Sequence, residues 1–187
     1  AASDVYKRQY YNYIDDFIAA DRDGTTTEVE GEDMNNVNFT QYNALFTGLE
    51  VSGQYALAKI NDFDIISNVM IDFLKGYRNS NDKALSRIPQ TKMNFGISAV
   101  NEDWDANLAY YHYFDKEFIG PFQTRTGGHS RLDFDLTRDF NYSDLSGHLM
   151  FTASNLLDVV GRSHLESKKA HVQLPGRSFM FMLKLFY

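Results

Sequence analysis

The sequence predicts an all-β chain of about eight long antiparallel strands that form part of a transmembrane β-barrel. Three observations predict it: apolar residues recur at every second position, the alternating stretches are long, and short and long connections follow one another in turn. Period two is the signature of a strand with two different faces. The aromatic share of 15%, mainly Phe and Tyr, fits apolar residues spread singly along such strands.

The clearest alternation lies in residues 177–187. One face carries Phe179, Phe181, Leu183, Leu185 and Tyr187. The residues between them fall on the opposite face, because successive side chains of a strand point to opposite sides of the sheet. The pattern therefore predicts a terminal strand with one fully apolar face.

Two interior stretches, 92–100 and 131–137, repeat this alternation and indicate what the second face meets. In 131–137, three apolar residues alternate with Arg131, Asp133 and Asp135. A face with two carboxylates and a guanidinium group is costly to bury in a dry core. We expect this face to meet water and the opposite face to meet an apolar environment.

Five further stretches complete the set of strands: 8–19, 38–57, 63–75, 104–115 and 145–155. Most of the predicted strands have about 10 to 13 residues, whereas strands of soluble proteins average about 5 to 6 and membrane-spanning strands need about 9 to 11. Strand length therefore favours a membrane barrel. A soluble β-barrel or β-sandwich that binds a ligand is the alternative.

The connections alternate in length. Short ones are expected at 58–62, 101–103 and 140–144, and long ones at 20–37, 76–90, 116–130 and 156–176. Short periplasmic turns and long extracellular loops are the layout of outer-membrane barrels. Because the last strand starts after a long loop, we expect Tyr187 on the periplasmic side.

Composition excludes several classes of function. The net charge of −7 argues against nucleic acid as a partner, since binding phosphates needs clustered Lys and Arg. The absence of Cys excludes disulfides and thiolate metal sites. The chain has no GxSxG motif, and ion pairing in a water-filled lumen accounts for Asp133 and Asp135. We therefore do not expect an enzyme.

Aromatic residues near strand ends are candidates for the lipid–water boundary, where one end of the ring is apolar and the other wet. Trp104 follows a short turn and is expected at the periplasmic boundary. Tyr110, Tyr111 and Tyr113 lie toward the other end of the same strand and are expected at the outer boundary. A cross-strand aromatic cluster in a soluble core is the alternative.

Four short motifs, in order, carry a resemblance to a known family. Gly48-Leu49-Glu50 lies in a strand, Arg87-Ile88-Pro89 ends a loop, NLLD spans 155–158 and LPGRSF spans 174–179. Together they resemble the C-terminal end of TonB-dependent outer-membrane receptors, and the zinc-uptake branch most of all. The resemblance covers 10–187. Residues 1–9 fit no strand period, and we expect them to be an artefactual or disordered leader.

The resemblance implies a place in the outer membrane of a Gram-negative bacterium, in contact with its lipid, and energised import of a scarce nutrient such as a metal ion or metal chelate. The chain would be the C-terminal portion of a larger barrel. The TonB complex would act through a plug domain that this chain lacks. The apolar face of 177–187 resembles the signal read by the barrel-assembly machinery. A self-contained eight-stranded barrel with a structural or adhesion role is the alternative.

The last long loop holds candidate metal ligands. His164 and His171 flank Glu166, and zinc accepts imidazole and carboxylate ligands. Since the spacing matches no HxH or HExxH motif, solvated surface residues are the alternative. We expect no resident cofactor, and zinc or a metal chelate would be the transported ligand.

Overall fold

The computed structural model describes residues 3–143 and 145–186. They form eight strands: β1 (Ser3–Val29), β2 (Glu32–Ile60), β3 (Phe63–Arg78), β4 (Lys92–Val100), β5 (Trp104–Tyr113), β6 (His129–Tyr142), β7 (Leu145–Ser154) and β8 (Ser178–Phe186). The predicted all-β class is confirmed. Among the described residues, no helix is long and apolar enough to cross a membrane.

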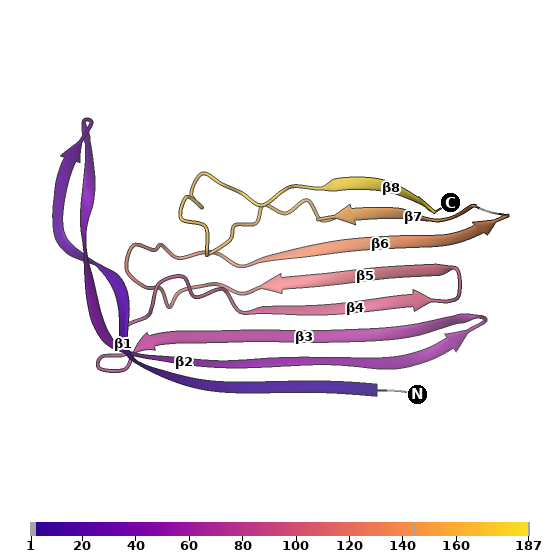
Figure 1. Cartoon of the computed structure of the whole chain (residues 1–187), viewed down its shortest axis with the longest axis horizontal. Coiled ribbons are helices and arrows are strands. Elements are labelled where there is room, and N and C mark those ends of the chain that lie inside the picture. Colours follow the sequence, from indigo (N-terminus) through magenta and orange to yellow (C-terminus); the bar gives the residue numbers. More distant parts are fainter. Residues whose placement is uncertain (1–2, 144, 187) are drawn as a thin grey trace.

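The strands form one antiparallel sheet in which each strand pairs with its neighbours in the sequence, in the order β1 to β8. Figure 1 shows this meander as an open sheet with β1 and β8 at its two edges. Within the described residues β1 does not pair with β8, so each edge strand has one unpaired side. Unpaired strand edges expose backbone donors and acceptors to any further strand.

Short and long connections separate to opposite ends of the sheet, as the sequence predicted. The tight connections after β2, β4 and β6 lie at one end of the sheet, here called the turn end (Figure 1). The first residues of β1 and the last residues of β8 lie at the same end. Residues 79–91, 114–128 and 155–177 lie at the other, the loop end.

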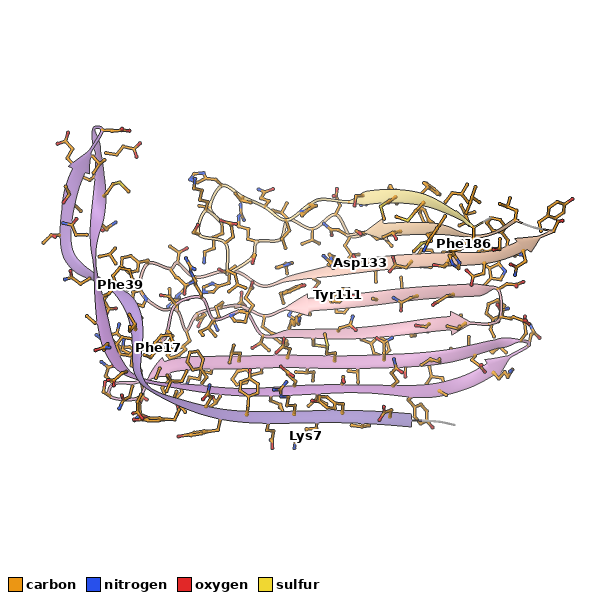
Figure 2. The ribbon with its side chains drawn as sticks, viewed as in Figure 1. Lys7, Phe17, Phe39, Tyr111, Asp133 and Phe186 are labelled. Carbon is orange, nitrogen blue, oxygen red and sulfur yellow. The ribbon has the colours of Figure 1, made fainter. Side chains whose placement is uncertain are left out.

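The structure corrects the expectation for the first long loop. Residues 20–37 were expected to be irregular, but β1 and β2 stay paired up to Val29 and Glu32, where the two-residue turn Glu30-Gly31 reverses the chain. Both turn residues have positive φ, 53° and 85°, as a type I′ hairpin turn requires. The stretch TTTEV favours a strand because β-branched residues fit the extended backbone. The outer part of this hairpin bends away from the sheet and carries Phe39 (Figures 1 and 2).

Residues 3–9 also differ from expectation, because they belong to β1 and pair with residues 49–55 of β2. Their side chains nevertheless break the pattern of the sheet. Lys7 pairs with Val51 and Gln9 with Leu49, so two polar side chains share the face of apolar neighbours (Figure 2). The expected disorder of residues 3–9 is therefore wrong, whereas the artefactual origin of 1–9 stays a prediction.

The two faces of the sheet differ in chemistry. One, here called the apolar face, presents exposed large side chains on seven strands. They include Val5, Tyr55, Val69, Ile71, Phe73, Phe95, Ile97, Leu108, Tyr110, Leu149, Phe179, Phe181, Leu183 and Leu185. The opposite, polar face carries Arg131, Asp133, Asp135 and Asp139 of β6. None of the described large side chains is fully buried, so the sheet has no core of the soluble kind.

A small core does form on the polar face at the loop end. Leu85 and Ile88 of the loop 79–91 are buried against Ala44 of β2, with Phe46 and Leu74 packed around them. The predicted motif at 87–89 thus holds this loop against the sheet. Nearby, the Arg78 guanidinium forms an ion pair with Asp21 and stacks on Tyr42 at 4.0 Å, which joins the projecting hairpin to β3.

Candidate ligand pocket at the loop end

A row of four side chains crosses the polar face where the strands meet the loops. Asp72 of β3 pairs in register with Lys92 of β4, Lys92 with Tyr113 of β5, and Tyr113 with His129 of β6. Lys92 Nζ lies 3.6 Å from Asp72 Oδ2. The rings of Tyr113 and His129 stack at 4.5 Å, with planes inclined by only 8°. Backbone register therefore fixes this row.

Arg131 extends the row along β6, two residues from His129. Its Nη2 lies 2.8 Å from Asp133 Oδ2, and its guanidinium stacks on Tyr111 at 5.0 Å. Figure 2 labels Tyr111 and Asp133 on neighbouring strands. Asp133 is buried, and its other oxygen accepts a hydrogen bond of 2.9 Å from the backbone N–H of Asn155. One carboxylate thus orients the arginine and anchors the start of the last loop.

The two C-terminal motifs hold the base of the loop 155–177 together. Asn155 Nδ2 donates to the carbonyl oxygens of Val159 and Pro175, at 3.0 and 3.2 Å. Arg177 N–H donates to Asp158 Oδ1 at 3.0 Å. Asn155 and Asp158 both have positive φ, 51° and 54°, a conformation that Asn and Asp tolerate better than most residues. The motifs NLLD (155–158) and LPGRSF (174–179) are therefore joined by hydrogen bonds across the base of the loop.

His164 is enclosed by two loops. It is 2% exposed, and its Nδ1 lies 2.8 Å from Thr126 Oγ1 and 3.2 Å from Lys169 Nζ. Lys169 Nζ also donates to Thr126 Oγ1 and to the carbonyl oxygen of Thr124. An ammonium group only donates, so Nδ1 of His164 is an acceptor and Nε2 carries the proton. Burial, reinforced by Lys169 and Lys116, lowers the pKa of His164 to about 4.

These parts enclose a pocket of about 280 Å³, here called the mouth pocket. The strands contribute Asp72, Lys92, Tyr113, His129 and Arg131, and the loops contribute Pro89, Gln90, 162–165 and Leu174. Gly161 lets the last loop approach the imidazole, because a Cβ at this position would lie only 2.6 Å from His129. Three cationic side chains and one carboxylate line the pocket.

The predicted metal residues do not meet. His164 is buried against Lys169, whereas His171 is exposed. Glu166 accepts a hydrogen bond of 3.0 Å from the backbone of Lys168. Across 3–143 and 145–186, no group of three His, Asp or Glu residues could hold a metal ion. The structure thus does not form the expected site, because short sequence spacing in a loop does not make side chains converge.

The predicted boundary aromatics divide between the two faces. Trp104 begins β5 at the turn end on the apolar face, with Arg138 stacked on it at 4.4 Å, and Tyr110 shares that face. Tyr111 and Tyr113 point to the polar face. The four aromatic residues therefore do not lie together on one face, because neighbours in a strand point to opposite sides. On β8, Phe179, Phe181, Leu183 and Leu185 are exposed on the apolar face, and Tyr187 lies outside the described residues.

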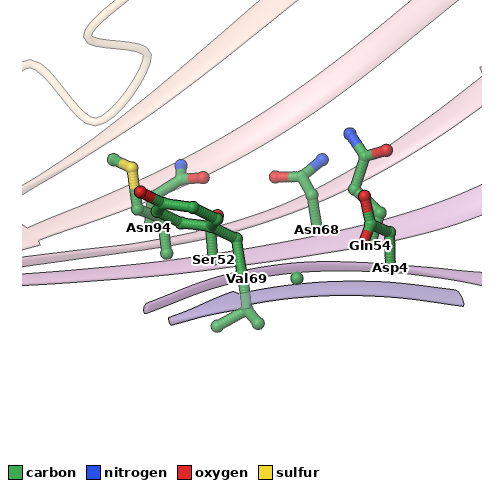
Figure 3. Close-up of a pocket in the computed structure, with 9 residues that line it drawn as sticks. Asp4, Ser52, Gln54, Asn68, Val69 and Asn94 are labelled. Atoms are coloured by element: carbon green, nitrogen blue, oxygen red, sulfur yellow. The ribbon is translucent and has the colours of Figure 1, made fainter. Parts of the chain in front are cut away.

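Several residues of the pocket were missed from the sequence. Lys92 and His129 carry a local signal, since each stands at a strand start in period with polar residues of the same strand. Arg162 and Lys169 carry none, because their positions depend on how two loops pack. A second pocket of about 300 Å³ lies on the polar face over β1 to β4. Figure 3 shows Asn68 and Gln54 on the side of the sheet opposite Val69.

The comparisons with known proteins bear on the fold. No protein-family model matches the chain. Among solved structures, a chain described as "Copper transporter OprC" matches with a TM-score of 0.80 over 98% of this chain, at 19% sequence identity. The match covers 29% of the OprC chain, so this chain spans less than a third of that protein's length. The likeness establishes that the eight-stranded sheet has the fold of a part of that transporter.

Proposed function

We propose that this chain is barrel wall of an outer-membrane transport protein of the TonB-dependent kind, which imports a scarce nutrient and catalyses no reaction. The apolar face carries the proposal. Exposed large side chains that continue across one face of seven strands, opposite a face with paired charges, fit a wall between lipid and water. Soluble proteins rarely expose apolar surface of this extent.

The separation of loops and turns supports an orientation. In outer-membrane barrels the long loops face the exterior and the tight turns face the periplasm. The mouth pocket, at the loop end of the polar face, would then open toward the outside of the cell and the lumen.

The two unpaired edges support a larger barrel. Backbone groups in lipid need hydrogen-bond partners, so an open eight-stranded sheet requires further strands beside β1 and β8. The match to less than a third of OprC agrees with this. In the proposal the TonB complex acts through a plug domain, and the apolar β8 is presented to the barrel-assembly machinery. The transported nutrient is a metal ion or metal chelate, as the name of OprC suggests.

Cysteine labelling of the full-length gene product in intact cells tests the orientation, with the parent protein as the background control, because these 187 residues contain no Cys. Ala170→Cys places a thiol on an exposed part of the last loop, and Glu102→Cys places one in the exposed turn after β4. A membrane-impermeant maleimide should label the Ala170 variant in whole cells and the Glu102 variant only after permeabilisation. Equal labelling of both, or recovery in the periplasmic fraction, would contradict the proposal and favour a soluble β-domain.

The electrophoretic behaviour of this chain alone separates the larger barrel from a self-contained one. Expressed without additional strands, it should fail to form a monodisperse barrel in detergent. A heat-modifiable monomer would instead support an eight-stranded barrel with a structural or adhesion role.

A further inference from the structure

The mouth pocket gathers polar atoms that the fold leaves without partners. Six buried side-chain nitrogen atoms of the described residues lack a hydrogen bond, and five of them belong to residues that line this pocket. They are both ring nitrogens of His129, Nε of Arg131, Nε of Arg162 and Nε2 of His164. Folded proteins pair almost all such groups, so a cluster in one pocket points to a ligand that pairs with them.

The unpaired atoms are mainly hydrogen-bond donors. Arginine Nε always carries a hydrogen atom. His164 offers N–H at Nε2, because its Nδ1 accepts hydrogen bonds from its neighbours. The ring is 2% exposed and lines the pocket, and its Nε2 is buried without a partner. A matching ligand group is one rich in acceptors.

The local charge selects the sign of that ligand. Arg162 forms no ion pair among the described residues, and the same holds for Lys116 and Lys169, which are 9% and 8% exposed and whose charges both act on His164. Lys92 and Arg131 have carboxylate partners. The pocket is therefore a positive region in a chain of net charge −7. A bare metal cation would be repelled there although two imidazoles are present.

The face of the sheet selects the source of the ligand. Asp72, Lys92, Tyr113 and His129 all lie on the polar face, opposite the exposed apolar side chains. The pocket is thus turned away from the surface proposed to meet lipid, and a lipid phosphate would have to leave the membrane to enter it.

We propose that the mouth pocket binds a soluble ligand through an anionic oxygen group, a carboxylate or phosphate, held by Arg162, Arg131 and Nε2 of His164. Guanidinium groups bind such anions with paired, charge-assisted hydrogen bonds. The inference rests on the proposed function only in that the pocket then opens to the exterior, and it identifies the ligand of that transporter as an anion.

Isothermal titration of the full-length gene product, purified in detergent, tests the proposal with citrate and inorganic phosphate as probes. We expect saturable binding of at least one probe. Arg162→Gln should weaken it about ten- to a hundredfold, the effect of losing a hydrogen bond to a charged group. Arg162→Lys keeps the positive charge but loses the paired N–H donors of the guanidinium group. Its affinity for the probe should lie between those of the parent and Arg162→Gln. The matched control is Arg125→Gln, an exposed arginine of the loop 114–128 paired with Glu117, which should bind as the parent does.

Three results would overturn the proposal. The first is no saturable binding of either probe at millimolar concentration by a protein that shows heat-modifiable mobility. The second is equal weakening by Arg162→Gln and Arg125→Gln. The third is binding of a different ligand in place of both probes. That ligand would be Zn²⁺ or Cu²⁺, bound tightly in a way that His129→Gln abolishes and Arg162→Gln leaves intact, or it would be purified lipopolysaccharide. Labelling of the Ala170→Cys and Glu102→Cys variants reports the orientation independently of anion binding. Failure of the anion site can therefore be told apart from failure of the transport proposal.

Discussion

His164 Nδ1 lies 3.2 Å from Nζ of Lys169, so a neutral imidazole accepts a hydrogen bond from a buried ammonium group. The contact joins two turns of the loop 155–177, and Thr126 joins both side chains to the loop 114–128. Burial also lowers the pKa of Lys169. Protonation of His164 would place two positive charges side by side with no carboxylate between them, so the ordered loops depend on a neutral imidazole.

The last loop should lose stability on acidification. The pKa of His164 is about 4 in the folded chain and takes its ordinary value of 6.5 in the unfolded chain, so below pH 6.5 the unfolded loop binds a proton that the folded loop excludes. The stabilisation is complete above pH 6.5 and falls until the pH reaches about 4. The protection of the amides of residues 155–177 against hydrogen exchange, expressed relative to their intrinsic exchange rates at each pH, should therefore decrease as the pH is lowered across this window.

Two variants check the source of that effect. His164→Asn removes the titrating group while its amide oxygen can still accept from Lys169, and it should flatten the pH dependence. His171→Asn changes an exposed histidine of the same loop and should leave it unchanged. If the His164 variant keeps the full pH dependence, another group causes it.

Gly161 should tolerate no side chain. An added Cβ would lie 2.6 Å from the imidazole of His129, which cannot swing aside because it is stacked on Tyr113. Gly161→Ala should destabilise the loop end by about 1–3 kcal/mol, the usual effect of overpacking. It should also increase proteolysis of residues 155–177. At Gly127 an added Cβ would meet only Asp115 Oδ1, at 4.0 Å. Gly127→Ala is therefore the matched control, and equal sensitivity of both variants would contradict the prediction.

Most of the sheet could be predicted because its signals are local. Period two located the strands at 92–100, 131–137 and 177–187, each of the other five overlaps a stretch named from the sequence, and the alternation of connections gave the two ends. The hairpin at 20–37 was missed because acidic and threonine-rich residues read as a solvated loop, although β-branched residues and Glu30-Gly31 favour a strand and a turn. The same alternation, applied to Tyr110, Tyr111 and Tyr113, would have placed them on two faces. The mouth pocket could not be predicted, because strand register brings Lys92 and His129 into its lining and loop packing brings Arg162 there.

Asn155 should be essential to the base of the last loop. It is 4% exposed, and its side chain makes hydrogen bonds to Val159 and Pro175. Asn155→Ala leaves these backbone groups without their partners, at about 1–3 kcal/mol for each group that stays buried, and it forces Ala to a φ of 51°. Amide exchange in 155–177 should increase strongly.

Asn155→Gly separates the two causes. Glycine accepts positive φ but makes no side-chain hydrogen bond, so a large effect of this variant assigns the loss to hydrogen bonding. Asn141→Ala, at an exposed position near the turn end of β6, serves as control. Near-parent exchange in Asn155→Ala would show that the loop base is held by other contacts.

The apolar face of β8 should be required for insertion. Leu183 and Met182 are adjacent near the middle of the strand, 58% and 46% exposed, and they point to opposite faces. Lys on a lipid-facing strand position costs about 2–4 kcal/mol near the bilayer midplane, whereas lumen positions tolerate charge. Leu183→Lys should therefore reduce the heat-modifiable form in the outer-membrane fraction, and Met182→Lys should leave it near the parent level. Because the two variants add the same charge to the same edge strand, any difference between them reports which face meets lipid, and equal insertion of both would contradict a membrane-facing β8.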